Sequence, residues 1–173
     1  MILRYLADAL VILGCGYIGI LLAGKMDGRI RQLEGLEQML SQLAFNIGFL
    51  SLPLKDAILR TAESQQGIIQ SVLRQVSGLM QRFPHMPLRE VWEESVRYCQ
   101  AGLCLEDEDY AALFDFAAHI GQGDVGTELN NIRLTSAKLK LSVEQAREKR
   151  KKDGKLCKGL GFLTGMLIVL LLA

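Results

Sequence analysis

The sequence predicts an all-α protein, a cytoplasmic antiparallel bundle of about six helices flanked by N- and C-terminal membrane helices. Three observations lead to this prediction. Apolar residues in the middle of the chain recur at intervals of three and four, which is the spacing of one helix face. No segment there alternates apolar and polar residues, and no Asn-Gly or Asp-Gly turn joins two such segments. Long apolar segments occupy both ends of the 173 residues.

The N-terminal segment, residues 1–26, is predicted to be the first membrane helix. From Tyr5 to Gly24 the chain is apolar or glycine except for Asp8, a length close to the ~20 residues that cross a bilayer. Its glycines, which would let neighbouring helices approach closely, are Gly14, Gly16 and Gly19. A carboxylate in such a segment is a functional candidate, although Asp8 lies near the outer end, where headgroups would hydrate it. Its role stays open.

The same glycines also have the spacing of a dinucleotide-binding fingerprint, Gly-x-Gly-x-x-Gly. That motif needs a preceding strand, a following helix, and a second strand that ends in an acidic residue about 20 positions on. Glu34 stands near that distance, but the apolar residues around it recur at helical spacing. A membrane-attached nucleotide-binding oxidoreductase is therefore the weaker alternative. A pore-forming helical membrane protein is another.

The C-terminal segment, residues 156–173, is predicted to be the second membrane helix. Nothing from Gly159 to Ala173 is charged, and Gly161 and Gly165 have the spacing of a small-residue packing face. The uncharged run is slightly shorter than the ~17 residues usually needed to span. Lys158 can lengthen it by placing its ammonium group at the interface.

Basic residues indicate the orientation of the two membrane helices. They are concentrated between positions 147 and 158, with a few more from 25 to 31, on the inner side of each span. The positive-inside rule therefore puts the bundle, residues 27–155, in the cytoplasm. The formal net charge is +1, which gives no whole-chain reason to expect a nucleic acid partner.

The first helix of the bundle is predicted to continue out of the membrane, from about Gly28 to Leu50. Its apolar residues share one face: Ile30, Leu33, Leu36, Leu40, Leu43, Ile47 and Leu50. Pro53 then stands in the first turn of a second helix, where proline is tolerated. The apolar face of that helix is Leu54, Ala57, Ile58 and Ala62.

The third helix is expected over apolar positions from Ile69 to Phe83, and the segment "FPHMP" ends it. Pro87 opens the fourth helix. The residues that share one side of this helix are predicted to be Leu88, Val91, Trp92, Ser95 and Cys99.

Acidic residues from Glu106 to Asp109 open the fifth helix, where they complement the positive end of the helix dipole. Its inner stripe is predicted to be Tyr110, Leu113, Phe114 and Ala117. Gly121 is the expected stop, and the last helix starts near Asp124.

No catalytic, cofactor-binding or metal-binding constellation is expected. His85 and His119 have no nucleophile or carboxylate at a spacing that suggests a catalytic pair. Cys99 and Cys104 lack the second pair or the histidines that would complete a metal site. We therefore expect a protein that is not an enzyme and that takes no small-molecule substrate.

Several segments, in this order and spacing, resemble one family over almost the whole chain. They are "RIRQLEGLEQMLSQL", "PLKDAILRTA", "REVWEESV", "HIGQGDVGTELNNIRLT" and "AREKRKKDGKLCKGLGFLTGMLIVLLL". The family is stage III sporulation protein AB, and its cytoplasmic region is similar to the helical domain of platform proteins in type II secretion and type IV pilus systems.

This resemblance implies an assembly component of a channel between mother cell and forespore. The implied partners are a cytoplasmic secretion-type ATPase, other sporulation channel membrane proteins and the lipid bilayer. The implied location is the mother-cell side, in the outer forespore membrane. The oligomeric state stays open, and a homo-oligomer is compatible with this role.

A docking platform needs an exposed surface for its partners, and two segments are the candidates. One is the corner "FPHMPLREVWEESV", and the other is the turn "HIGQGDVG". The predicted contact residues are Arg89, Glu90, Glu93, Glu94, Arg97, Gln122 and Asp124.

Overall fold

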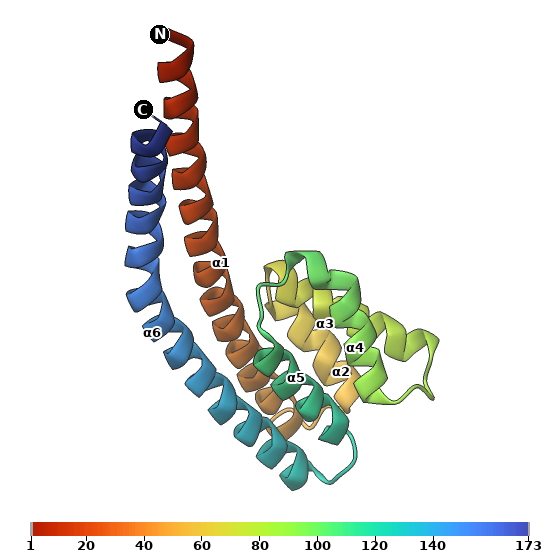
Figure 1. The fold of residues 1–173 in the computed structure, drawn as a ribbon. Coiled ribbons are helices and arrows are strands. Elements are labelled where there is room, and N and C mark those ends of the chain that lie inside the picture. The colour runs from red at the N-terminus through yellow and green to blue at the C-terminus, as the bar shows by residue number, and fades with distance from the viewer. Residues whose placement is uncertain (1, 173) are drawn as a thin grey trace. The chain divides into compact units, whose positions relative to one another are not determined.

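The computed structural model describes the backbone of residues 2–172 and the side chains of residue 21 and residues 24–153 (Figure 1). Within this range the chain is helical and contains no strand. The elements are α1 (Ile2–Gly48), α2 (Leu54–Ser64), α3 (Gly67–Arg82), α4 (Leu88–Cys99), the 3-10 turn η1 (Gln100–Gly102), α5 (Asp107–His119) and α6 (Val125–Leu172). The prediction of an all-α fold with about six helices is confirmed.

The two predicted membrane helices, 1–26 and 156–173, lie mostly outside the residues whose side chains are described. The same is true of Asp8 and of the packing glycines Gly14, Gly16, Gly19, Gly161 and Gly165. Among the described residues, no helix combines the length and the apolar character that crossing a membrane requires.

The dinucleotide-binding alternative fails on the backbone of α1. This helix is continuous from Ile2 to Gly48, so Gly14 lies inside it and has no strand before it. The fingerprint requires a strand, a tight glycine turn and then a helix N-terminus facing the phosphates. The backbone of α1 therefore does not have the strand–turn–helix geometry that a dinucleotide fingerprint at these glycines requires.

The chain divides into two compact units, Met1–Ile30 with Glu144–Ala173, and Arg31–Val143. Within the first unit an ion pair joins α1 to α6. Arg150 Nε lies 2.7 Å from Asp27 Oδ1, and Arg150 Nη2 lies 3.1 Å from Asp27 Oδ2. Such a two-pronged contact fixes the relative orientation of the two side chains better than a single bond does. It holds α1 and α6 together at this point of the unit.

Within the second unit α1 and α6 also pack against each other, and they run antiparallel. Lys140 Nζ lies 3.4 Å from Glu37 Oε1. Further along α1, a Cβ atom at Gly48 would lie 3.1 Å from Leu129 Cδ1, so the missing side chain lets Leu129 pack against the helix backbone. From the first contact to the second, the residue number rises from 37 to 48 on α1 and falls from 140 to 129 on α6, so the two helices are antiparallel. Positions 31 and 143, the ends of the unit, therefore lie on the same side of it.

The core of the second unit is built on the predicted apolar face of α1. Leu33, Leu36, Leu40 and Leu43 are all nearly inaccessible to solvent. The helices α2, α3, α4 and α5 pack in succession and add further core residues (Figure 1). Ile132, Leu139 and Val143 of α6 are buried as well. Trp92 of α4 meets Phe116 of α5 edge to face, with ring centroids 5.9 Å apart.

A buried polar contact joins α1 to α2. Asn46 is fully buried and donates through Nδ2 to Thr61 Oγ1 at 3.0 Å and to the Ala57 carbonyl at 3.4 Å. Thr61 Oγ1 in turn donates to the Ala57 carbonyl at 2.7 Å. Because a polar group left unbonded in a core is costly, this chain of bonds favours one alignment of the two helices.

Two leucines on α6 provide a matched test of this core. Leu139 is 0 % exposed and Leu141 is 61 % exposed. We expect Leu139→Ala to lower the free energy of unfolding by about 2–5 kcal/mol, because it removes buried methyl groups and leaves a cavity. Leu141→Ala should change it by less than about 0.5 kcal/mol. Urea unfolding followed by the fluorescence of Trp92, the single tryptophan, measures both. Equal losses for the two variants would contradict the assigned core.

Candidate partner-binding surface

The fourth helix separates a buried face from a charged one. Pro87 precedes α4 with a φ of −55°, which suits a helix start. The buried face of α4 is Val91, Trp92, Ser95, Val96 and Cys99. The predicted contact residues occupy the other side, where Glu93 is half-buried and Arg89, Glu90, Glu94 and Arg97 are exposed.

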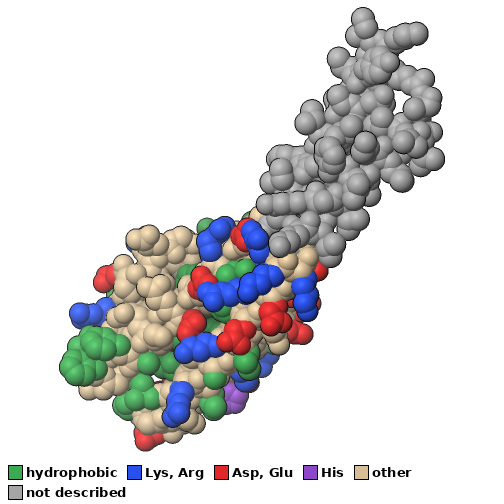
Figure 2. Space-filling view, turned by 90° about the vertical axis from the view of Figure 1, so that its left-hand side faces the viewer, with side chains coloured by type: hydrophobic (Ala, Val, Ile, Leu, Met, Phe, Trp, Pro, Cys, Tyr) green, Lys and Arg blue, Asp and Glu red, His purple; other side chains and the backbone are tan. Residues whose placement is uncertain are grey.

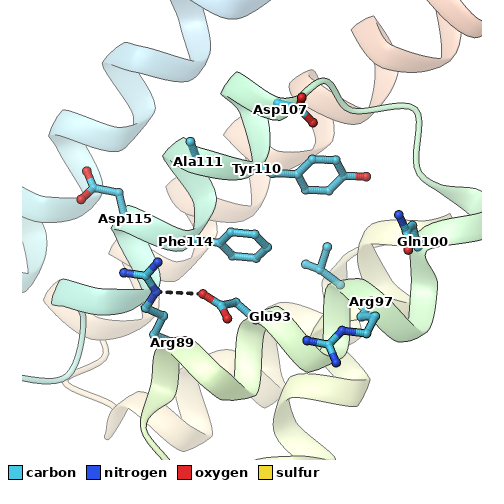
Figure 3. Close-up of a pocket in the computed structure, with 10 residues that line it drawn as sticks. Arg89, Glu93, Arg97, Gln100, Asp107, Tyr110, Ala111, Phe114 and Asp115 are labelled. Atoms are coloured by element: carbon cyan, nitrogen blue, oxygen red, sulfur yellow. Dashed lines mark hydrogen bonds and ion pairs between the residues drawn. The ribbon is translucent and has the colours of Figure 1, made fainter.

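A groove of about 690 Å³ runs between α4 and α5, and we call it the α4–α5 groove (Figure 3). It is lined by Arg89, Glu93, Val96, Arg97, Gln100, Asp107, Tyr110, Ala111, Phe114 and Asp115. Three of the predicted contact residues, Arg89, Glu93 and Arg97, therefore share one concavity. Glu90 and Glu94 do not line it.

Two aromatic rings from α5 form the apolar part of the groove. Tyr110 and Phe114 stack with centroids 6.2 Å apart and an angle of 20° between the rings. The prediction that they belong to the inner stripe of the fifth helix is wrong for these two residues, which are half-buried, because the inner positions are taken by Leu113, Phe116 and Ala117. The spacing of three and four selected the helix, but it did not separate the core from the groove beside it.

Charged side chains of both signs frame the aromatic pair. Arg89 Nε contacts Glu93 Oε1 at 2.8 Å, one turn along α4, as the dashed line in Figure 3 marks. Arg97 Nη1 lies 3.3 Å from Glu94 Oε2, and the Arg97 side chain is 70 % exposed. Exposed pairs of this kind add little stability, so both arginines can exchange their partners for groups on another molecule.

Asp115 marks the end of the groove nearest α6. Its Oδ2 lies 3.0 Å from Lys138 Nζ, and its Oδ1 lies 3.6 Å from His119 Nδ1. The hydrogen bond from Lys138, followed by the charge of that ammonium group, lowers the pKa of the Asp115 carboxyl. On the opposite side of the groove opening, burial is the main cause that raises the pKa of the Tyr110 hydroxyl.

The groove wall begins at a helix cap that the sequence analysis did not identify. Glu106 and Asp109 form a reciprocal capping box at the start of α5, and the Glu106 backbone N–H donates to Asp109 Oδ2 at 2.9 Å. Asp109 is fully buried, whereas the sequence predicts for this acidic cluster only a favourable charge at a helix start. The spacing of three residues between two carboxylates before an apolar run was the available signal.

The two contact residues predicted in the α5–α6 turn make bonds within that turn. Asp124 Oδ1 accepts hydrogen bonds from the Thr127 backbone N–H at 3.1 Å and from Thr127 Oγ1 at 2.5 Å, which lower the pKa of Asp124. Gln122 Nε2 donates to the Ala118 carbonyl at 2.6 Å, at the end of α5. Asp124 therefore caps α6, and Gln122 lies outside the α4–α5 groove.

Glu128 holds the same turn from the inside. Its Oε1 accepts the backbone N–H groups of Gly121 at 2.8 Å and Gly123 at 3.1 Å. Gly121 has a φ of +84°, a conformation that side chains disfavour, as expected for the predicted stop. The turn that joins α5 to α6 is thus fixed by one buried carboxylate.

Among the described residues, Cys99 and Cys104 do not belong to a metal-binding cluster. Cys99 is buried, and burial raises the pKa of its thiol, while Cys104 is half-buried. Within the part of the chain that the structure describes, no group of three or more His, Cys, Asp or Glu side chains could hold a metal ion.

Known proteins match this chain along nearly its whole length. The family model for stage III sporulation protein AB matches residues 4–173. A protein of Bacillus subtilis (strain 168) named stage III sporulation protein AB is 28 % identical over 176 residues, which cover 98 % of this chain and 99 % of that protein. A solved structure titled stage III sporulation protein AB (SpoIIIAB) has a TM-score of 0.65 at 22 % identity, covering 72 % of this chain and 98 % of that one.

Lys138 offers a direct test of the electrostatics around the groove. We expect Lys138→Met to raise the pKa of Asp115 toward its ordinary value, because the variant removes the hydrogen bond and the charge that lower it. The stabilisation from a lowered carboxyl pKa is present above the ordinary value of 3.8 and is lost as the pH falls through the folded pKa. In Lys138→Met that pH dependence should shrink.

The Asp115 carboxyl carbon shift, followed by NMR as a function of pH, measures this effect. Lys140→Met is the matched control, because Lys140 contacts Glu37 instead. An unchanged Asp115 pKa in Lys138→Met would contradict the assigned contact.

Proposed function

Since the chain belongs to the stage III sporulation protein AB family, we propose that it is a membrane-anchored assembly component of a sporulation channel and not an enzyme. In this proposal the second unit lies in the cytoplasm of the mother cell, and the α4–α5 groove docks a cytoplasmic ATPase of the secretion type. Other channel membrane proteins assemble around it in the outer forespore membrane.

Membrane anchoring is supported by the chain ends and by the helix pairing. Residues 1–26 and 156–173 carry the apolar sequence that we interpret as membrane helices. The antiparallel packing of α1 and α6 in the second unit sends positions 31 and 143 out on the same side. Two helices that leave together can enter the same bilayer surface, and the basic residues from 147 to 158 would face its headgroups.

Docking of a protein partner is supported chiefly by the α4–α5 groove. Aromatic and arginine side chains are the residues that most often dominate binding energy at protein interfaces, and the groove combines Tyr110 and Phe114 with Arg89 and Arg97. The groove therefore offers apolar area and oriented charge, which are what a docking surface needs. The similarity to secretion platform proteins that the family resemblance implies would fit this role.

A binding measurement between the full chain in lipid nanodiscs and the purified cognate ATPase tests the proposal. We expect Phe114→Ala to raise the Kd about thirtyfold, because it removes a central apolar contact. Arg97→Glu should raise it about tenfold, since it reverses a charge at the rim. This second variant alters an exposed side chain and should leave the fold intact.

The matched control is Arg60→Glu, an exposed charge reversal on α2 that does not line the groove. Its Kd should equal that of the unaltered chain. If the intact chain fails to bind the ATPase, or if all three variants bind equally well, the docking proposal is wrong.

A further inference from the structure

The connection between α3 and α4 carries a second concavity, which we call the corner cavity. It measures about 510 Å³, and its apolar lining includes Leu54, Met80, Phe83, Met86, Leu88 and Ile120. A smaller cavity of about 370 Å³ adjoins it and shares Phe83, Pro84 and Met86 with it. Gln122 from the α5–α6 turn also lines the corner cavity. The cavity therefore contains residues from both segments in which the sequence predicts partner contacts, the corner "FPHMPLREVWEESV" and the turn "HIGQGDVG".

The apolar side chains of the corner cavity are accessible from solvent. Phe83 is 54 % exposed, and Met80 and Met86 are half-buried. Hydrophobic side chains also gather in exposed clusters, among charged ones, on the face that Figure 2 shows. Methionine adapts its shape to different partners, and a concave apolar surface of this size suits a side chain inserted from another molecule.

The charged side chains that line the corner cavity and the smaller cavity beside it are both positive. The charged side chains that line the two adjoining cavities are Arg82 and Arg89, and neither cavity is lined by Asp or Glu. Arg89 contacts Glu93, which lies outside both cavities. Arg82 is exposed and forms no ion pair among the described residues. The α4–α5 groove differs in this respect, because its lining includes three carboxylates, Glu93, Asp107 and Asp115.

We propose that the corner cavity binds a short acidic segment of a protein partner, in which a large apolar side chain is flanked by Asp or Glu. The apolar side chain enters between Phe83 and the two methionines, and the carboxylates pair with Arg82 and Arg89. This contact is additional to ATPase docking at the α4–α5 groove, with which the cavity shares only Arg89. The chain then holds two partners, or two segments of one partner, at neighbouring positions.

The test uses the full chain in nanodiscs of uncharged lipid and a fluorescein-labelled peptide made of Leu, Phe and Glu. Its control peptide has every Glu replaced with Lys. Fluorescence anisotropy should show that the acidic peptide binds at least about tenfold more tightly than the basic one. We expect Phe83→Ala and Arg82→Glu each to weaken acidic-peptide binding about tenfold.

Two matched variants control for nonspecific hydrophobic binding of the peptide and for a general effect of charge reversal. Tyr98→Ala removes an aromatic side chain that is 76 % exposed and lines neither cavity. Arg74→Glu reverses an exposed charge on α3, the helix that also carries Arg82. Both should bind the acidic peptide as the unaltered chain does.

Three outcomes would overturn the proposal. The two peptides could bind equally, or Phe83→Ala could leave the affinity for the acidic peptide unchanged. A water-soluble short-chain phosphatidylglycerol could instead bind through Phe83 while the acidic peptide does not, and the cavity would then be a lipid site. Because none of these measurements involves the ATPase, each is independent of the docking test for the α4–α5 groove.

Discussion

The antiparallel packing of α1 against α6 constrains what the two ends of this chain can do. Contacts between Glu37 and Lys140 and between Gly48 and Leu129 set the direction of the two helices in the second unit. As a result, the helices α2 to α5 form an insertion between two paired helices, and positions 31 and 143, the ends of the second unit, lie on the same side of it. A chain with this connectivity can be held at two points by one surface, while α4 and α5 remain available to partners.

The candidate binding surface follows from how the core is filled. Trp92 and Phe116 occupy the interior between α4 and α5, so the neighbouring positions on each helix turn outward. Those positions carry arginines on α4 and a stacked aromatic pair on α5. The corner cavity forms where the connection between α3 and α4 meets the end of α5, because Pro84 and Pro87 interrupt the helices there. One packing arrangement therefore produces two concavities of different charge.

The sequence predicted the helices well because their apolar spacing is regular and prolines or glycines separate them. Gly121 and the buried leucine face of α1 are examples. The sequence could not show that Tyr110 and Phe114 line a groove, because their spacing also fits the buried face of a helix. In the structure, Leu113 and Phe116 occupy the buried face of α5 instead. The grooves themselves join residues far apart in the chain, such as Leu54 with Gln122, and no local pattern records such a meeting.

We propose that two membrane segments hold a cytoplasmic helical unit, and cysteine labelling in living cells tests this arrangement most directly. The four native cysteines would be replaced, with Ala at the buried Cys99 and Ser elsewhere, and the exposed Tyr98 changed to Cys as the only thiol. The account predicts that a membrane-impermeant maleimide labels this position only after lysis, and that the chain resists alkaline extraction from membranes. Labelling of Tyr98→Cys in intact cells, or release of the chain at alkaline pH, would contradict it.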